Sequence, residues 1–591
     1  MNTAISNSLN PDQKKAVEHT DGPSVILAGA GSGKTRVLVH KVKYLVEEAG
    51  VPPYQILMIT FTNKAAAEMK ERIAKSVNLE TNLGYVGTFH AFCARLMRIH
   101  ADLLGYTQKF VIYDSGDQVA ILRKIIKNKL TTSYSPSYFL HRISNAKNEM
   151  IGPNKYLEVF SDHQAKDVQK IYDLYQKELK KNNAVDFDDL LVKTIELLTF
   201  HPEVLEKYQN KYRYILVDEF QDTNLAQYVI TRMLGEKYKN VTIVGDFSQS
   251  IYSFRGADIQ NLDKFQKDFP KSIVFHLERN YRSSQNILNF AFQIISKNKT
   301  HPILELMSEN VHGDVVEFFE AEGEQEEALY LINEMDRLQD KYPYSSFAVL
   351  YRTNAQSRTI EEAFLHRGVP YVLVGGTRFY ERKEVKDILS YLRLLVNPAD
   401  EVSKDRALKI GKRKFDGFKV LLNEIKDTYQ DMTTEAVMER VFDATKYLEL
   451  YHVDDPEDFN RLENIKELKS VAVSFPDLVQ FLEQIALVES EYSEGEKRGI
   501  KDGVKLMTLH QAKGLEFDCV FIVGVEEGIL PHSRSTDDYF QLEEERRLFY
   551  VGITRARKKL YITHAKRRFI FGRRGEALKS RFLFENEDYL S

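Results

Sequence analysis

The chain has 591 residues, of which 43% are hydrophobic and 28% are charged, and its formal net charge at pH 7 is −4. This length exceeds what one hydrophobic core can organise and predicts about three to four domains. The composition is that of a soluble globular protein, and the longest apolar runs, such as CVFIVGV (519–525), have only the length of a strand. We therefore expect no association with a membrane.

The cysteines and the amino terminus indicate the compartment. Cys93 and Cys519 lie far apart in the sequence, which excludes a disulfide framework and a cysteine-rich metal site. The first residues, MNTAISNSLNPDQKK, lack the basic-then-apolar pattern of a signal peptide. We expect a cytoplasmic protein. Its charges are uneven: residues 555–581 are strongly basic, and 322–327 and 543–545 are acidic, although each run also fits a solvated face.

Short apolar runs alternate with helical patterns in two separate parts of the chain. The predicted strands of the first part are 24–29, 56–62, 214–219 and 241–246, and those of the second are 347–353, 504–510, 519–524 and 560–565. Alternating strands and helices predict parallel sheets, whose ligands bind at the carboxyl ends of the strands. The sequence therefore predicts an α/β protein with two parallel-sheet lobes and a cleft between them.

Two long segments between these strands are rich in helical patterns and nearly free of strand patterns. We interpret residues 106–190 as a first helical insertion and residues 381–500 as a second, shortened one. The first lobe then comprises 1–105 and 191–276, and the second lobe comprises 277–380 and 501–591. The sequence shows no internal repeat and no low-complexity linker.

A glycine-rich segment, the P-loop, directly follows the first predicted strand and precedes a helical pattern. Its residues are Ala28, Gly29, Ala30, Gly31, Ser32, Gly33, Lys34 and Thr35. The glycines allow a tight turn whose N–H groups surround phosphate oxygens, Lys34 supplies a cation for the β- and γ-phosphates, and the Thr35 hydroxyl ligates magnesium. A glycine-rich turn without function is the alternative, but the strand before it and the helix after it favour a nucleotide site.

The segment ILVDEFQDT (215–223) is the predicted partner of the P-loop. Its apolar strand ends in two acids, so that Asp218 would hold magnesium and Glu219 would polarise the attacking water. Two adjacent acids also fit a capping or surface role, which the preceding apolar strand disfavours. Arg282 and Arg555 fall in the second lobe, where either is placed to reach the γ-phosphate, although each taken singly fits a surface ion pair better.

Motifs in a fixed order along almost the whole chain complete the pattern. They are LNPDQKKAV (9–17), AGAGSGKT (28–35), TFTNKAAAEMKERI (60–73), GTFHAFCARLMR (87–98), VDEFQDTN (217–224), GDFSQSIYSFRGAD (245–258), NYRSSQNIL (280–288), YRTNAQSR (351–358), GGTRFYERKEVKDILSYLRLLVNP (375–398), LMTLHQAKGLEFDCVF (506–521) and EERRLFYVGITRARKKLYITHA (544–565). With these motifs the chain resembles the UvrD/Rep/PcrA group of superfamily-one DNA helicases. The resemblance implies two RecA-like P-loop lobes, each with a helical insertion. It also implies an ATP-dependent motor that moves 3′-to-5′ on single-stranded DNA and unwinds duplex DNA, in repair or replication.

The resemblance also implies a set of nucleotide contacts, with ATP and Mg²⁺ as cofactors. Gln13 would read the adenine edge, Arg36 and Tyr281 would flank the base, and Glu516 would bind the ribose hydroxyl. The residues that it assigns to the γ-phosphate are Gln249, Arg282 and Arg555. The fifteen histidines show no spacing of metal ligands, so we expect no metal beyond magnesium.

A motor that ignores base sequence should grip backbone charge and stack bases. The residues predicted to bind DNA on this ground are Phe61, Asn63, His90, Tyr252, Phe254, Arg255 and Asn354. An isolated phenylalanine more often packs in a core, and His90 also fits a buried, hydrogen-bonded histidine. Loop motifs surround Phe61 and Phe254, however. We interpret residues 245–258, here called the coupling loop, as facing the γ-phosphate through Gln249 and the DNA through its aromatic side chains.

Two features depart from the family pattern and leave alternatives open. Phe254 stands where relatives commonly carry tryptophan. In addition, LKIGKRKFDGFKV (408–420) replaces a glycine-bracketed helix-hairpin-helix, so the sequence does not predict that this segment anchors duplex DNA. The first alternative is a translocase that strips proteins from single strands but unwinds weakly. The second, from another class, is a nucleotide-gated DNA-binding protein without a motor. The expected partners are single-stranded DNA and single/double-strand junctions.

Overall fold

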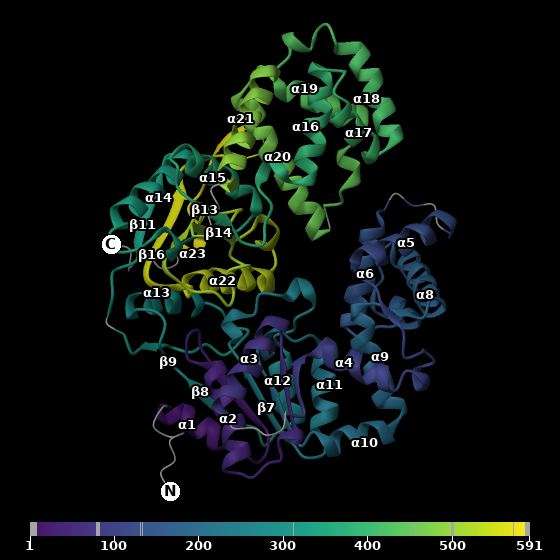
Figure 1. Cartoon of the computed structure of the whole chain (residues 1–591), viewed down its shortest axis with the longest axis vertical. Helices are drawn as coiled ribbons and strands as arrows, with labels where there is room; N and C mark the ends of the chain where they lie inside the picture. Colours follow the sequence, from purple (N-terminus) through teal and green to yellow (C-terminus); the bar gives the residue numbers. More distant parts are fainter. Residues whose placement is uncertain are drawn as a thin grey trace. The chain divides into compact units, whose positions relative to one another are not determined.

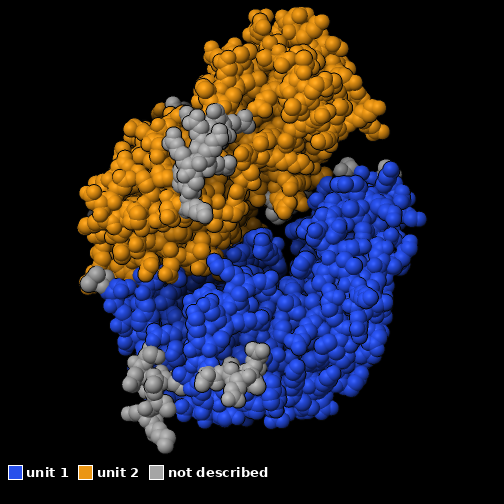
Figure 2. Space-filling view, viewed as in Figure 1, with its two compact units in different colours: residues 1–282, 295–311 blue, residues 283–294, 312–591 orange. Residues whose placement is uncertain are grey.

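The computed structural model describes residues 9–77, 83–129, 132, 134–310, 312–453, 455–497, 502–570 and 573–584. The chain forms two compact units (Figures 1 and 2). Unit 1 consists of Met1–Arg282 and Ile295–Val311, and unit 2 consists of Ser283–Ile294 and His312–Ser591. The chain therefore leaves unit 1 after Arg282 and returns to it for one short segment.

Unit 1 is built on a six-stranded parallel sheet in the order β3-β2-β6-β7-β1-β8. Its strands are β1 (Ser24–Ala28), β2 (Ile56–Thr60), β3 (Tyr85–Thr88), β6 (Tyr214–Val217), β7 (Asn240–Gly245) and β8 (Ile273–Leu277). The inner strands are apolar and buried because helices cover both faces of the sheet. Since β6, β7 and β1 are neighbours, the loops after them meet at one edge of the sheet.

Helices of unit 1 form the layers on the two faces of this sheet. They are α1 (Pro11–Glu18), α2 (Lys34–Glu47), α3 (Asn63–Ser76), α4 (Phe89–Ile99), α9 (Phe187–Phe200), α10 (Pro202–Lys211), α11 (Leu225–Gly235) and α12 (Asn261–Asp268). One face carries the core that contains Phe92, and the other carries the core that contains Leu38.

Cys93 and Cys519 are both buried and free.

The first insertion contains helices that pack on one another, as the grouping of α5, α6 and α8 in Figure 1 shows. Its elements are β4 (Val111–Ile112), α5 (Ser115–Lys129), α6 (Pro136–Asn148), α7 (Tyr156–Val159), α8 (Ala165–Lys181) and β5 (Ala184–Val185). Fully buried aromatic residues, among them Phe139, Tyr156 and Tyr175, form a core of its own. This segment has helical amphipathicity rather than strand patterns because its helices bury only one face each.

Unit 2 contains a second six-stranded parallel sheet, in the order β11-β16-β15-β12-β14-β13. Its strands are β11 (Glu317–Ala321), β12 (Phe347–Tyr351), β13 (Tyr371–Leu373), β14 (Val504–Thr508), β15 (Phe517–Ile522) and β16 (Ala556–Ala565). The accompanying helices are α13 (Gln285–Ile295), α14 (Glu324–Leu338), α15 (Ser357–His366), α22 (Tyr539–Ile553) and α23 (Arg581–Phe584). The short strands β17 (Arg567–Ile570) and β18 (Arg573–Glu576) also pair in unit 2, whereas β9 (Arg279–Asn280) and β10 (Met307–Ser308) pair with each other in unit 1.

The predicted fold class, α/β with two parallel sheets, is confirmed. The four central strands of each sheet are those that the apolar runs predicted. Within the two six-stranded sheets, the strands that the apolar runs did not predict are β3, β8, β11 and β13, the two edges of each sheet; the short strands of the two-stranded sheets were not predicted either. Edge strands carry fewer consecutive apolar residues because one side is exposed to solvent, as in β8 and β11.

The second insertion is helical in the structure. Its helices are α16 (Lys383–Val396), α17 (Glu401–Ile410), α18 (Lys412–Ile425), α19 (Thr434–Thr445), α20 (Pro456–Ser474) and α21 (Leu478–Lys497), packed around a core that contains Leu389, Leu468 and Phe481 (Figure 1). Within the described ranges no single helix has the length and apolar composition needed to cross a membrane. The pair Glu457–Ser474 and Leu478–Val488 meets this test only together, and it is bent by 118°.

Candidate functional site

The P-loop (28–35) turns between β1 and α2 at the carboxyl edge of the unit 1 sheet. Gly31 and Gly33 have φ angles of 66° and 86°, in the left-handed region that favours glycine. Gly33 is the N-cap of α2, and among the described residues no side chain caps this helix end. The first N–H groups of α2 therefore fit a phosphate group, with Lys34 and Thr35 partly exposed beside them.

Residues 280–282 hold the P-loop in place within unit 1. Asn280 Nδ2 donates a hydrogen bond to Ala30 O (2.6 Å), and the Tyr281 N–H donates to Gly31 O (3.0 Å). A Cβ atom at Gly31 would lie only 2.7 Å from Cβ of Arg282. The sequence analysis places Arg282 in the second lobe, whereas the structure places it in unit 1. The hydrogen bonds of residues 280 and 281 to the P-loop are the physical reason.

The amino-terminal helix contacts the P-loop from the other side through a capping box. The Gln13 N–H donates to Asn10 Oδ1 (2.8 Å), and the Asn10 N–H donates to Gln13 Oε1 (3.2 Å). Gln13 Nε2 then donates to Ser32 O (2.9 Å), and Asn10 Nδ2 donates to the Tyr281 hydroxyl (2.8 Å). Three of the residues predicted to contact the base, Gln13, Tyr281 and the exposed Arg36, thus lie around the start of α2.

The acidic pair follows β6, two strands away from the P-loop in the same sheet. Burial, then the charge of Glu219, raises the pKa of the Asp218 carboxyl to about 7, and the charge of Lys34 opposes this rise. Glu219 has a φ of 50°, a left-handed backbone that is costly for a residue with a side chain and that recurs at functional sites. A buried carboxyl beside a second acid fits a divalent cation.

The protein ligands for such a cation are few. Among the described residues there is no group of three or more histidine, cysteine, aspartate or glutamate side chains with metal-binding geometry. Mg²⁺ is commonly held by one or two protein ligands together with phosphate oxygens. Asp218 with Thr35 therefore suits Mg²⁺ better than a metal that needs a complete protein cage.

Gln221, which the sequence analysis did not select, connects the acidic pair to the coupling loop. Its Nε2 donates to Glu219 Oε2 (2.6 Å), and its Oε1 accepts from the Asp246 N–H (3.1 Å). Gln249 Nε2 donates to Asp246 Oδ2 (2.5 Å) in turn. Gln221 is fully buried. The sequence signal for this role of Gln221 is an amide in DEFQD (218–222), directly after a buried strand. A buried amide needs hydrogen-bond partners.

The other end of the coupling loop carries an aromatic cluster. The rings of Tyr252 and Phe61 are stacked, with centroids 5.6 Å apart and an interplanar angle of 13°. The Arg255 guanidinium lies 5.5 Å from the ring centroids of both Tyr252 and Phe254. Phe254 is 48% exposed. Exposed aromatic rings beside a cation are the groups that nucleic-acid bases stack on.

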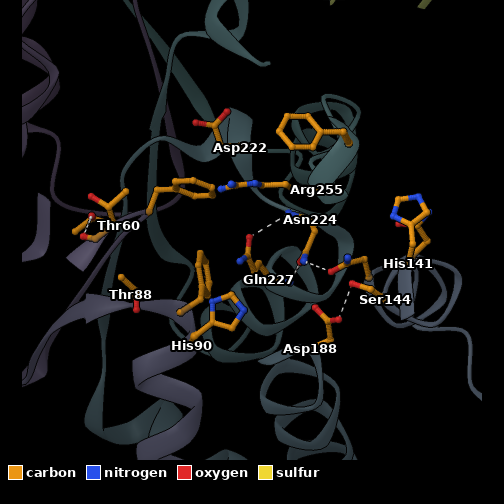
Figure 3. Close-up of a pocket in the computed structure, with 16 residues that line it drawn as sticks. Thr60, Thr88, His90, His141, Ser144, Asp188, Asp222, Asn224, Gln227 and Arg255 are labelled. Atoms are coloured by element: carbon orange, nitrogen blue, oxygen red, sulfur yellow. Dashed lines mark hydrogen bonds between the residues drawn. The ribbon is translucent and has the colours of Figure 1, made fainter. Parts of the chain in front are cut away.

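A pocket of about 450 Å³ opens beside this cluster (Figure 3). Phe61, Phe254, Arg255 and His90 line it together with polar side chains of α6, α9 and α11. The full lining is Thr60, Phe61, Thr62, Thr88, Phe89, His90, His141, Ser144, Asn145, Asn148, Asp188, Asp222, Asn224, Gln227, Phe254 and Arg255. Burial lowers the pKa of His90, so its ring is neutral at physiological pH. Asn63 begins α3 next to this pocket but does not line it.

Three predicted site residues belong to unit 2. Arg555 is 2% exposed, and its Nε and Nη1 donate to the backbone oxygens of Val551 (2.9 Å) and Leu515 (3.2 Å). Glu516 is exposed, and Asn354 is partly buried directly after β12.

Comparison with known protein families agrees with these motifs. Residues 9–270 match the UvrD/REP helicase N-terminal domain, and residues 275–452 and 412–567 match the UvrD-like helicase C-terminal domain. The chain belongs to the UvrD/REP helicase family. The resemblance inferred from the motifs is thereby confirmed, and the two parallel sheets correspond to the RecA-like lobes of this helicase family.

Individual members of the helicase family match along nearly the whole chain. The ATP-dependent DNA helicase PcrA of Staphylococcus aureus (strain Mu50 / ATCC 700699) is 41% identical over 635 residues, which cover 98% of this chain and 86% of the relative. The protein of the same name from Bacillus subtilis (strain 168) is 41% identical over 639 residues, covering 99% and 86%. The Staphylococcus epidermidis protein of this name is 41% identical over 638 residues, covering 99% and 87%.

Proposed function

We propose that this ATP-dependent DNA helicase moves 3′-to-5′ on single-stranded DNA and separates the duplex ahead of it, in DNA repair or replication. Family membership and the PcrA-named relatives support the helicase activity. The observation that carries the proposal is the shared sheet edge in unit 1. The P-loop, the acidic pair and the coupling loop all follow adjacent strands there. Single-stranded DNA and its junctions with duplex are the proposed partners.

The residues of unit 1 take distinct roles in the proposed hydrolysis of ATP. Lys34 and the N–H groups of the P-loop bind the phosphates, and Asp218 with Thr35 holds Mg²⁺. The ion, when bound, neutralises charge that develops on the transferred phosphoryl group. Glu219 orients and polarises the attacking water, while Gln221 fixes its carboxylate through the 2.6 Å hydrogen bond.

We also propose the four-part organisation expected from the sequence, with the two insertions as separate subdomains. Each insertion has its own buried core, around Tyr156 in the first and around Leu389 in the second. A separate core is what an independently packed subdomain requires. In unit 2 we propose that Arg555 contacts the γ-phosphate, Glu516 the ribose hydroxyl and Asn354 the DNA.

Strand displacement tests activity and direction together. We expect the protein to displace the shorter strand from duplexes with a 3′ single-stranded tail and not from matched duplexes with a 5′ tail, because the motor loads on the tail. ATP turnover should rise when single-stranded DNA is added. Displacement from the 5′-tailed duplex alone would contradict the proposed direction, and near-zero turnover at saturating single-stranded DNA would favour the nucleotide-gated binding protein instead.

A translocase that unwinds weakly is a second candidate, and one observation favours it. Gly411 separates α17 from α18 in the second insertion, and the Lys414 Nζ that follows donates to the backbone oxygens of Thr445 (3.2 Å) and Lys446. Of the three consecutive cations Lys412, Arg413 and Lys414, the last is thus hydrogen-bonded to the end of α19 instead of facing outward. Rapid DNA-stimulated turnover with little displacement at low protein concentration would identify this function; efficient displacement by monomers would exclude it.

The two ends of the coupling loop give separable predictions. Gln249→Ala should leave affinity for single-stranded DNA largely intact and reduce the distance moved per ATP hydrolysed, since Gln249 bonds to Asp246 on the nucleotide side. Phe254→Ala should weaken binding of a fluorescent single strand about 5- to 160-fold, because a stacked base contributes about 1–3 kcal/mol. Identical defects in both variants would contradict the assignment of the two ends to different ligands.

A further inference from the structure

Asn148, the last residue of α6 in the first insertion, contacts elements of both functional regions of unit 1. Its Oδ1 accepts a hydrogen bond from Asn224 Nδ2 (2.7 Å), and both residues are buried. A Cβ atom at Gly256 of the coupling loop would lie 2.9 Å from Cβ of Asn148. Asn148 also lines the pocket. The insertion thus reaches the pocket, the coupling loop and α11 through one side chain.

Asn224 ends the short segment that begins at Glu219. It is the N-cap of α11 in a capping box, in which the Gln227 N–H donates to Asn224 Oδ1 (2.9 Å) and the Asn224 N–H donates to Gln227 Oε1 (3.1 Å). These bonds fix the side chain, so that its Nδ2 is directed at Asn148. Within the same segment, Gln221 Nε2 donates a hydrogen bond to the carboxylate of Glu219 at the other end. The position of Asn148 therefore affects residues 219–224. This segment contains Glu219, the residue proposed to polarise the attacking water.

Gly256 connects Asn148 to the side chains that face the pocket. It has a φ of 83°, and it directly follows Phe254 and Arg255 in the coupling loop. The Asp258 N–H also donates to Thr223 O (3.0 Å), which ties the end of this loop to the residue before Asn224. We therefore expect a shift of the coupling loop at the pocket to displace Asn148 and residues 219–224, the Glu219 segment.

A buried ion-pair network fixes the place of Asn148 itself. The neighbouring Lys147 Nζ lies 2.6 Å from Asp186 Oδ2 and 2.9 Å from Asp189 Oδ1, and these side chains are at most 2% exposed. Asp186 is the N-cap of α9, the helix that begins beside the pocket. These ion pairs join the end of α6, where Asn148 lies, to the start of α9.

We propose that Asn148 is a positioning residue. Through its contacts with Asn224 and Gly256, it links binding of single-stranded DNA in the pocket to the Glu219 segment, and DNA binding thereby accelerates ATP hydrolysis. The inference rests on the proposed function. DNA that binds more tightly when the Asn148–Asn224 bond is formed stabilises that arrangement, and with it the Glu219 segment, by the difference in its affinity for the two states. A non-hydrolysable nucleotide analogue that favours the same arrangement should raise DNA affinity by the factor by which DNA raises the affinity for the analogue; this reciprocity concerns binding and not the rate of hydrolysis.

The test compares Asn148→Ala with wild type in two measurements. The first is the ratio of ATP turnover with saturating oligo(dT) to turnover without DNA, together with the oligo(dT) concentration at half stimulation. We expect the ratio to fall about fivefold or more, in the range of allosteric couplings, with a smaller change in the half-stimulating concentration. The second is oligo(dT) affinity with and without a non-hydrolysable ATP analogue, and we expect the wild-type difference between the two to be lost.

Glu149→Gln is the matched control. Glu149 directly follows Asn148, is exposed and is not among the residues that line the pocket. Its stimulation ratio should stay within about twofold of wild type, within ordinary surface effects. Asn224→Ser keeps α11 capped and removes the donor to Asn148, so it should reproduce the defect even where Asn148→Ala folds poorly.

Three outcomes decide the matter. A wild-type stimulation ratio in both Asn148→Ala and Asn224→Ser would overturn the inference and leave the proposed function in place. An equal fall in Glu149→Gln and Asn148→Ala would also overturn it, since general disturbance of the end of α6 would then explain both. Absence of DNA-stimulated turnover in the wild-type protein would overturn the proposed function, and the inference with it.

Discussion

Replacement of Lys34 by alanine is expected to lower ATP turnover at saturating single-stranded DNA by about 100-fold or more and to abolish strand displacement. Lys34 begins α2 at the end of the P-loop, and its charge acts on the buried Asp218. The variant loses the cation that would face the β- and γ-phosphates, and removing one preorganised charge-stabilising group costs about 10²–10³ in turnover. Steady-state phosphate release and displacement of a 3′-tailed duplex measure the two effects.

Lys75→Ala is the control for this substitution. Lys75 lies near the end of α3 in the same unit, 74% of its side chain is exposed, and its partner is Glu71 one turn away. Such an exposed ion pair contributes little, so turnover should stay within about twofold of wild type. Unchanged turnover and displacement in Lys34→Ala would contradict the assignment of the P-loop as the site of ATP hydrolysis.

Replacement of Lys147 by methionine should destabilise the first insertion by about 3–5 kcal/mol, because it leaves two buried carboxylates without their cation. Burial lowers the pKa of Lys147, but the charges of Asp186 and Asp189 outweigh it and raise this pKa overall. Tyr175 also donates to Asp186 (2.9 Å). The melting transition that includes this subdomain should fall by on the order of 10 °C, as measured by calorimetry.

A triple variant separates loss of the charge pair from loss of packing. In Lys147→Met combined with Asp186→Asn and Asp189→Asn, none of the three replaced residues carries a charge, and asparagine still caps α9. Much of the lost stability should return, since neutral side chains of similar size replace buried ion pairs at little cost. A single Lys147→Met variant as stable as wild type would show that the ion pairs do not hold α6 against α9.

Local patterns revealed the central strands, the P-loop and the acidic pair. Each central strand is a run of apolar residues because it is covered on both faces, and the polar chemistry begins where the run stops. The edge strands escaped detection because solvent on one side relaxes this requirement, as in β8 and β11. The place of Arg282 at the end of the first segment of unit 1 could not be inferred locally either, because the hydrogen bonds of Asn280 and Tyr281 to the P-loop join residues some 250 positions apart.

The sequence by itself determined the family, the two-sheet architecture and the residue types of the nucleotide site, since glycines, a lysine and paired acids at strand ends are required locally by phosphate and metal chemistry. Only the tertiary structure decided which polar side chains connect these motifs. Gln221, Asn224 and Asn148 are ordinary amides in the sequence. They acquire their roles because buried amides need hydrogen-bond partners, and folding brings those partners from three separate segments to one edge of one sheet.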